Sequence, residues 1–189
     1  MKYNDLTVKQ MLEIQAIEKT GDELNDNMNI LTILFGENIL STPVVELKKM
    51  LSEIDLTPVK SNVQPKYIIN GKCYTLDTKM DITTSQYIDY CNYKKDNDIV
   101  KMLSVFLIPE GHTYNDGYDI FEVIKDIEDM KWVDAEAIGF FFIKRFALFT
   151  KIFLNCLEAK MKKNKMTETE QNIINILHSF NNSVSSLML

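Results

Sequence analysis

Few residues of this chain have the type and spacing that catalysis requires. The two histidines, His112 and His178, lie far apart in the sequence. A nucleophile pair such as Cys91 with His112 is conceivable, but thiols on apolar faces are usually inert. Phosphate-binding loops of the GxxxxGK[ST] type and the GxGxxG, GxSxG and HExxH motifs do not occur in the sequence. We therefore predict a protein that is not an enzyme, with no catalytic and no cofactor-binding residues.

Carboxylates gather in one stretch of the chain: Asp116, Asp119 and Glu122, with Asp96 and Asp98 nearby in sequence. Their oxygens could bind a hard cation such as calcium or magnesium. The spacing does not match a twelve-residue EF-hand loop, and Asn and Asp beside Gly117 are typical of a turn. Asp119 and Glu122 also suit the first turn of a helix electrostatically. We favour a turn followed by a helix cap and predict no metal ligands, although a cation at Asp116 stays open.

Composition narrows the classes of partner. The formal net charge is −6 and the sequence pI is about 5.0, which disfavours both nucleic acid and an anionic membrane surface, because both require an excess of Lys and Arg. Cys73, Cys91 and Cys156 form no CxxC pair, so we expect reduced thiols in a cytoplasmic protein. Acids dominate from Asp77 to Asp134 and bases from Lys144 to Lys165, a pattern that suits head-to-tail self-association or a charged protein partner.

The most apolar part of the chain is predicted to be a long aromatic helix over residues 135–163. Lys144, Arg145 and Lys151 interrupt it, so we do not expect it to span a membrane. An apolar helix of this kind is normally buried in a core or by a partner, and regularly spaced tyrosines suit a contact surface. The candidate partner-binding residues are Phe141, Phe142, Phe149, Ile152, Tyr87 and Tyr90.

Apolar periodicity and capping residues predict the remaining elements. Helices are expected over residues 6–19, 24–35, 44–54, 83–94, 99–108, 119–130 and 167–180. Thr7 is a candidate N-cap, either Thr83 or Thr84 is the candidate cap of the 83–94 helix, and Asp134 is the candidate cap of the long helix. The 83–94 helix is expected to bury Tyr87, Ile88 and Cys91. Two β-prone runs joined by Asn70-Gly71 predict a hairpin over residues 67–76, because both turn residues need positive φ.

These elements predict a mainly α, bundle-like single domain over residues 1–189 with one small β-hairpin. Its parts are N-terminal helices in 1–57, the hairpin in 66–77, a helical part in 83–180 and a flexible tail in 181–189. We expect the hairpin to pack on the helices or to pair with the edge of another chain, because an isolated hairpin is marginally stable.

Several stretches resemble virion or tail-assembly accessory proteins of tailed bacteriophages, particularly gut phages. They are TTSQYID at 83–89, VFLIPEG at 105–111 and FFF at 140–142, while LTVKQ at 6–10, residues 31–35 and Glu46-Leu47 look like the helical start of tail-assembly chaperones. The resemblance covers about residues 5–163. It implies a helical accessory protein that shields a partner such as the tape-measure protein or occupies a place in the particle. The implied locations are the host cytoplasm during assembly and the virion.

The function expected from the sequence is therefore non-catalytic protein–protein interaction, as a phage tail or virion assembly chaperone or a minor virion component. Its partners would be other phage structural or assembly proteins, with a homo-oligomer as a further possibility. The alternative is a bacterial cytoplasmic adaptor or regulator that binds one host protein. A stable monomer with a single small interface would favour this alternative.

Overall fold

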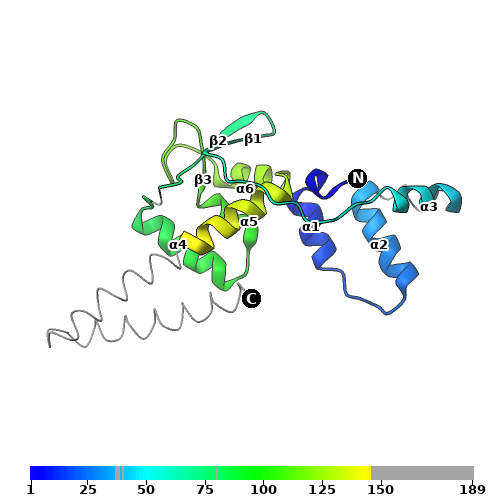
Figure 1. The fold of residues 1–189 in the computed structure, drawn as a ribbon. Helices are drawn as coiled ribbons and strands as arrows, with labels where there is room; N and C mark the ends of the chain where they lie inside the picture. The colour runs from blue at the N-terminus through cyan, green and yellow to red at the C-terminus, as the bar shows by residue number, and fades with distance from the viewer. Residues whose placement is uncertain (37–38, 40, 80, 146–189) are drawn as a thin grey trace. The chain divides into compact units, whose positions relative to one another are not determined.

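The computed structural model describes residues 1–36, 39, 41–79 and 81–145, and the chain groups into two compact units, Met1–Ile138 and Gly139–Leu189. The described part is mainly α-helical with a small three-stranded antiparallel sheet (Figure 1). The predicted 167–180 helix, the 181–189 tail and the long helix beyond residue 145 lie outside the described residues.

The N-terminal helices begin close to the positions that local signals predict. After a short 3-10 helix η1 (Tyr3–Asp5), α1 (Val8–Gln15) starts at a capping box, in which the Thr7 hydroxyl accepts from the Gln10 amide and the Gln10 side chain accepts from the Thr7 amide, both at 3.1 Å. Helix α2 (Glu23–Phe35) packs beside α1 (Figure 1) and stops at Gly36, whose φ of +87° suits a helix end. Helix α3 (Val44–Ser52) follows Pro43. The predicted Thr7 cap and the three predicted helices are confirmed, except that α1 ends at Gln15 and not at residue 19.

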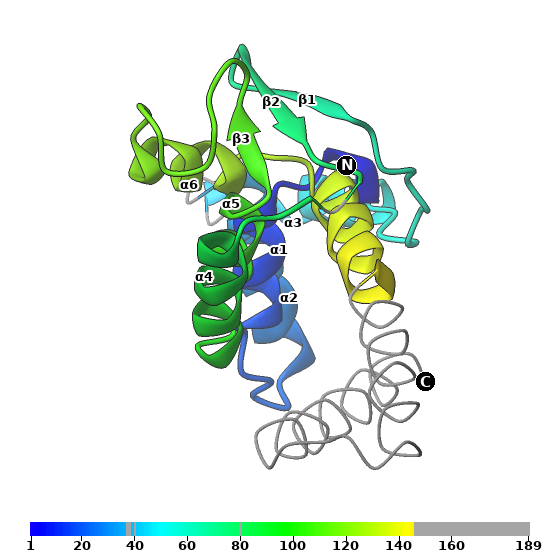
Figure 2. The same cartoon turned by 90° about the vertical axis from the view of Figure 1, so that its left-hand side faces the viewer.

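The hairpin forms as predicted and gains a third strand. Strands β1 (Lys66–Ile69) and β2 (Lys72–Leu76) pair antiparallel, with Ile69 opposite Lys72, and Asn70 and Gly71 make the turn at φ of +50° and +77°. The hairpin is completed within the chain by β3 (Leu107–Pro109), which pairs with the other edge of β2, giving the order β1-β2-β3 (Figure 2).

The predicted helix over residues 99–108 is wrong in its second half, where the chain forms the strand β3. Helix α5 (Ile99–Ser104) begins at Asp98, whose side chain accepts from the Lys101 amide, but it ends after six residues. The backbone then extends and forms its hydrogen bonds with β2, so Leu107 is fully buried as a residue of the sheet rather than of a helix. A short run with eight apolar residues among ten fits either structure, and pairing with a distant strand decides between them.

Helix α4 (Thr84–Lys95) has the predicted Thr83 cap but the opposite buried face. Tyr87 and Ile88, expected inside, are exposed, and Cys91 is half-buried. The buried residues are Gln86, whose side-chain amide donates to the Val105 carbonyl at 3.0 Å, and Tyr90, whose ring lies 5.4 Å from that of Phe106. A polar residue can occupy the core here because its hydrogen bond is satisfied.

The last described helix begins at residue 132, so the predicted cap at Asp134 is wrong. Asp134 lies inside the first turn, where it accepts a hydrogen bond from the Ser61 hydroxyl at 3.1 Å. The earlier start buries Trp132 and Val133. Among the described residues, no helix is long and apolar enough to cross a membrane.

The core of the first unit joins segments from both ends of it. Helix α6 (Ile120–Glu128) packs against α5, contacts α1 and β3, and starts at Asp119, whose side chain accepts from the Phe121 amide at 2.9 Å. Its inward side chains are fully buried together with residues of the N-terminal segment and of β3. The fully buried set includes Leu6, Val8, Leu107, Val123, Ile127 and Ile138.

Candidate functional site

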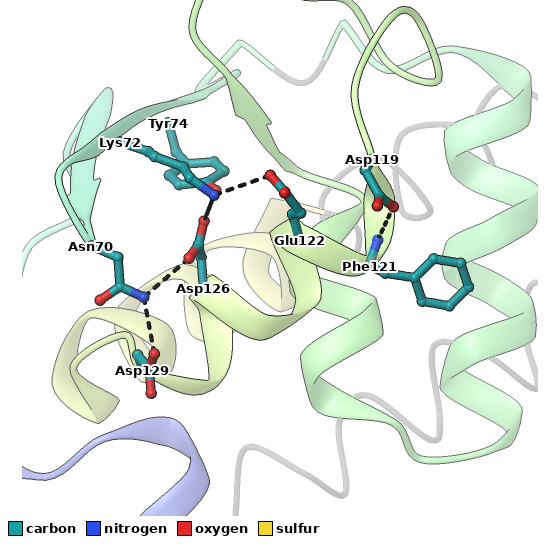
Figure 3. A network of polar contacts seen from close by, with 8 residues as sticks. All are labelled: Asn70, Lys72, Tyr74, Asp119, Phe121, Glu122, Asp126 and Asp129. Atoms are coloured by element: carbon teal, nitrogen blue, oxygen red, sulfur yellow. Dashed lines mark hydrogen bonds and ion pairs between the residues drawn. The ribbon is translucent and has the colours of Figure 1, made fainter.

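A polar network joins the hairpin to α6, with Asp126 at its centre (Figure 3). The Asp126 carboxylate is only 5% exposed and accepts from the Tyr74 hydroxyl at 2.5 Å and from the Asn70 side-chain amide at 3.0 Å. The Lys72 ammonium lies 2.9 Å from the same carboxylate. Since a buried charge is costly unless it is paired and hydrogen-bonded, these three donors are what allow Asp126 to sit inside.

Two periodicities bring these side chains together. Lys72 and Tyr74 stand two residues apart on β2 and so share one face of the strand, which lies against α6. On α6, Glu122, Asp126 and Asp129 follow one another at intervals of four and three residues and so share one stripe. Lys72 also contacts Glu122 at 3.2 Å, and Asn70 also donates to Asp129 at 2.9 Å.

Burial and hydrogen bonding together shift the pKa values of Asp126, Lys72 and Tyr74. Burial alone would raise the pKa of Asp126, but the hydrogen bonds from Tyr74, Asn70 and Lys72 outweigh it and lower that pKa below its ordinary value. The pKa of Lys72 is raised, first by its contact with Asp126 and then by Glu122. The pKa of Tyr74 is raised by burial and by its hydrogen bond to Asp126, so its hydroxyl stays protonated and donates. The network is a fixed structural connection between sheet and helix.

The lowered pKa of Asp126 predicts a loss of stability in acid. Because the folded-state pKa lies below the unfolded value of about 3.9, the contribution is complete above about pH 4 and is lost as the pH falls through the folded-state pKa. We expect the free energy of unfolding, measured in urea at about pH 6 and about pH 3, to fall less in Asp126→Asn than in the wild type. An equal fall in both proteins would show that Asp126 does not carry this dependence.

Beside the network is an open hollow of about 340 Å³. Lys72 and Tyr74 form one wall, and the other lining residues are Pro109, His112, Gly117, Tyr118, Asp119, Glu122 and Val123. The rings of His112 and Tyr118 meet edge to face at 5.9 Å, and His112 Nδ1 lies 3.1 Å from the Asp116 carbonyl. The hollow thus has aromatic walls and carboxylates at its edge.

The acidic stretch around Asp116 and Asp119 forms a turn followed by a helix cap, which is the structure that the sequence analysis favours. The Asp116 carboxylate accepts from the Thr113 hydroxyl at 3.3 Å, Asp119 caps α6, and Glu122 contacts Lys72. Within residues 1–145 as far as they are described, no group of three His, Cys, Asp or Glu side chains is placed to hold a metal ion.

No family model, curated protein or solved structure matches this chain.

Two of the residues proposed from the sequence for partner binding, Tyr87 and Tyr90, lie in the same unit as the Asp126 network but are not members of it. Tyr87 is exposed, whereas Tyr90 is only 8% exposed and packs on Phe106. The prediction that Tyr90 belongs to an exposed contact surface is therefore wrong. Phe142 is likewise buried, whereas Phe141 is half-buried with the Arg145 guanidinium 5.3 Å from its ring. Phe149 and Ile152 lie outside the described residues.

The sequence analysis did not single out the large apolar side chains that are most exposed among the described residues. Val45 is 82% exposed, Ile68 80% and Phe121 76%, on α3, β1 and α6 respectively. The Asp126 network was missed as well, although the strand pair at residues 72 and 74 and the helical stripe at 122, 126 and 129 carry a visible signal. Opposite charges on two predicted elements with matching periodicities indicate a contact, provided that the elements are known to be neighbours.

Proposed function

We propose that this chain is a non-catalytic protein that acts by binding another protein, and that α3 belongs to the binding surface. The observation that carries the proposal is that α3 has no buried residue. Its sequence nevertheless includes Val44, Val45, Leu47, Met50 and Leu51. Val44 is 66% exposed and Leu51 41%.

The position of these residues on the helix supports the proposal. Val44 and Leu51 are seven residues apart, and Leu47 lies between them, so the three share one stripe of α3. Single exposed apolar residues are common on protein surfaces, but a contiguous apolar stripe is typical of an interaction site. An amphipathic helix that presents such a stripe can lie in the groove of a partner or pack against a partner helix.

We further propose that the partner is a structural or assembly protein of a tailed bacteriophage, such as the tape-measure protein. Support for this comes from the resemblance of the N-terminal helices and of residues 83–89 and 105–111 to tail-assembly accessory proteins. In this role the chain serves as an assembly chaperone or as a minor component of the particle. An apolar helix is suited to covering apolar helical segments of a client until they assemble.

The proposal is tested with the variant Val44→Ser/Leu51→Ser and its control Ile68→Ser, which removes an apolar side chain from β1 that is exposed to an even larger extent. Each protein is co-expressed with the tape-measure protein of the same phage, and the complex is quantified by light scattering behind size exclusion. We expect the wild type and the control to form the complex and the α3 variant to lose affinity by about tenfold or more, since central apolar contacts dominate binding energy.

A complex that forms equally well with the α3 variant would contradict the role of α3. If the wild type forms no complex with phage proteins and remains a monomer that binds a single bacterial protein at one small interface, the adaptor function replaces the phage function. Circular dichroism of all three proteins checks that the helices are retained.

A further inference from the structure

The hollow beside α6 carries more negative than positive charge. Lys72 is shared between two carboxylates, at 2.9 Å from Asp126 and 3.2 Å from Glu122. Because Asp126 is buried and Glu122 has a side chain 68% exposed, the ammonium mainly compensates the buried charge. Glu122 and the exposed Asp119 therefore leave negative charge at the edge of the hollow.

The walls of the hollow suit a cation with an aliphatic stem. Tyr118, His112 and Pro109 supply flat apolar surface, while Glu122 and Asp119 supply acceptors. A Lys or Arg side chain combines these properties, because its methylene groups pack on apolar surface while its charged end reaches a carboxylate or an aromatic face. At about 340 Å³ the hollow has room for such a side chain.

The same chain contains a segment of the complementary chemistry. From Lys144 to Lys165 there are seven Lys and Arg residues against a single acidic one, Glu158. Lys144 and Arg145, the described members of this basic segment, are both exposed. Complementary charges on different parts of one chain favour a heterologous contact, in which one copy presents the first surface and the next copy presents the second.

We propose that the acidic hollow of one copy binds the basic segment, residues 144–165, of a second copy, so that this protein associates head to tail. The contact uses a surface other than α3. It rests on the proposed function and deepens it, because head-to-tail association lets several copies of an assembly protein bind next to one another on one client protein. Charge attraction guides the encounter, and a basic side chain in the hollow fixes the register.

The test uses two neutralised variants of the full chain. In the hollow variant, Asp119→Asn/Glu122→Gln, the charge is removed while Asn keeps the helix cap. In the segment variant, Lys160, Lys162 and Lys163 are each replaced by Gln. The control Glu13→Gln/Glu18→Gln removes two exposed charges from the region of α1 and so keeps the same net charge as the hollow variant.

Light scattering behind size exclusion is recorded over a concentration series at about 50 mM and about 500 mM salt. We expect the wild type and the control to form oligomers that salt weakens, and both neutralised variants to associate about tenfold more weakly. Mixing the two variants is expected to restore a one-to-one pair, because each supplies the surface that the other lacks.

Three results would overturn the inference. They are a wild type that is monomeric at every concentration, oligomers that the two variants leave unchanged, and mixed variants that form no pair. The Val44→Ser/Leu51→Ser variant separates this inference from the proposed function, since it is expected to keep the salt-sensitive oligomers while losing the client.

Discussion

Replacing Trp132 by Ala is expected to lower the free energy of unfolding by about 3–5 kcal/mol, the usual cost of truncating a buried tryptophan. Trp132 is buried, and its indole N–H donates to the Tyr3 hydroxyl at 2.7 Å, which in turn donates to the Glu136 carboxylate at 3.0 Å. The variant loses its packing and leaves Tyr3 without the indole donor. Since whole domains are stable by only about 5–15 kcal/mol, much of the margin disappears.

Urea unfolding followed by circular dichroism measures this loss, because Trp132 is the single tryptophan and the variant has no indole fluorescence. The matched control is Phe121→Ala, which truncates an aromatic side chain that is 76% exposed and should change stability by no more than about 0.5 kcal/mol. Similar losses in the two variants would refute the assignment of Trp132 to the core.

The second large effect is expected from Asp126→Ala, at about 2–3 kcal/mol of lost stability. The substitution leaves the Tyr74 hydroxyl, on a residue only 1% exposed, without its acceptor, and an unsatisfied buried polar group costs about 1–3 kcal/mol. It also removes one of the two carboxylate acceptors of the Asn70 amide. The midpoint of urea unfolding gives the change.

A double-mutant cycle makes this test specific. Adding Tyr74→Phe to Asp126→Ala should recover part of the stability, because no hydroxyl then remains buried without a partner. Asp129→Ala is the control, since Asp129 is exposed and Asn70 keeps Asp126. If the double variant is no more stable than Asp126→Ala alone, the hydrogen bond from Tyr74 is not the source of the loss.

Local signals predicted the helix starts at Thr7 and Thr83 and the turn at Asn70-Gly71 because each depends on a few neighbouring residues. The strand β3 was not predictable in the same way, because its hydrogen-bond partner β2 lies about thirty residues earlier in the chain. The buried face of α4 was also missed: its apolar residues define no clear stripe, and Gln86 enters the core only because the Val105 carbonyl accepts its hydrogen bond.

In the candidate sites, too, features set by neighbouring residues were predictable and contacts between distant elements were not. The sequence indicated that Asp119 and Glu122 belong to a helix start, and both residues line the hollow. It also indicated the separation of acidic and basic residues along the chain on which the proposed contact between copies depends. It did not indicate that Lys72 would lie beside Glu122 and Asp126, because that contact joins two elements fifty residues apart. Nor did apolar periodicity show that α3 keeps its stripe uncovered, since burial depends on the neighbours a helix acquires.

The attachment of the N-terminal segment to Trp132 has a consequence for the order of folding during synthesis. The Trp132 amide donates to the Leu6 carbonyl at 2.8 Å, and the Val8 amide donates to the Met130 carbonyl at the same distance. These residues are among the first and last of the unit to be translated. At roughly 5–20 residues per second, the first turn of α1 waits several seconds or more for its partners. The apolar residues Leu6 and Val8 stay without these partners during that interval, and this part of the core can close only after Met130 and Trp132 have left the ribosome.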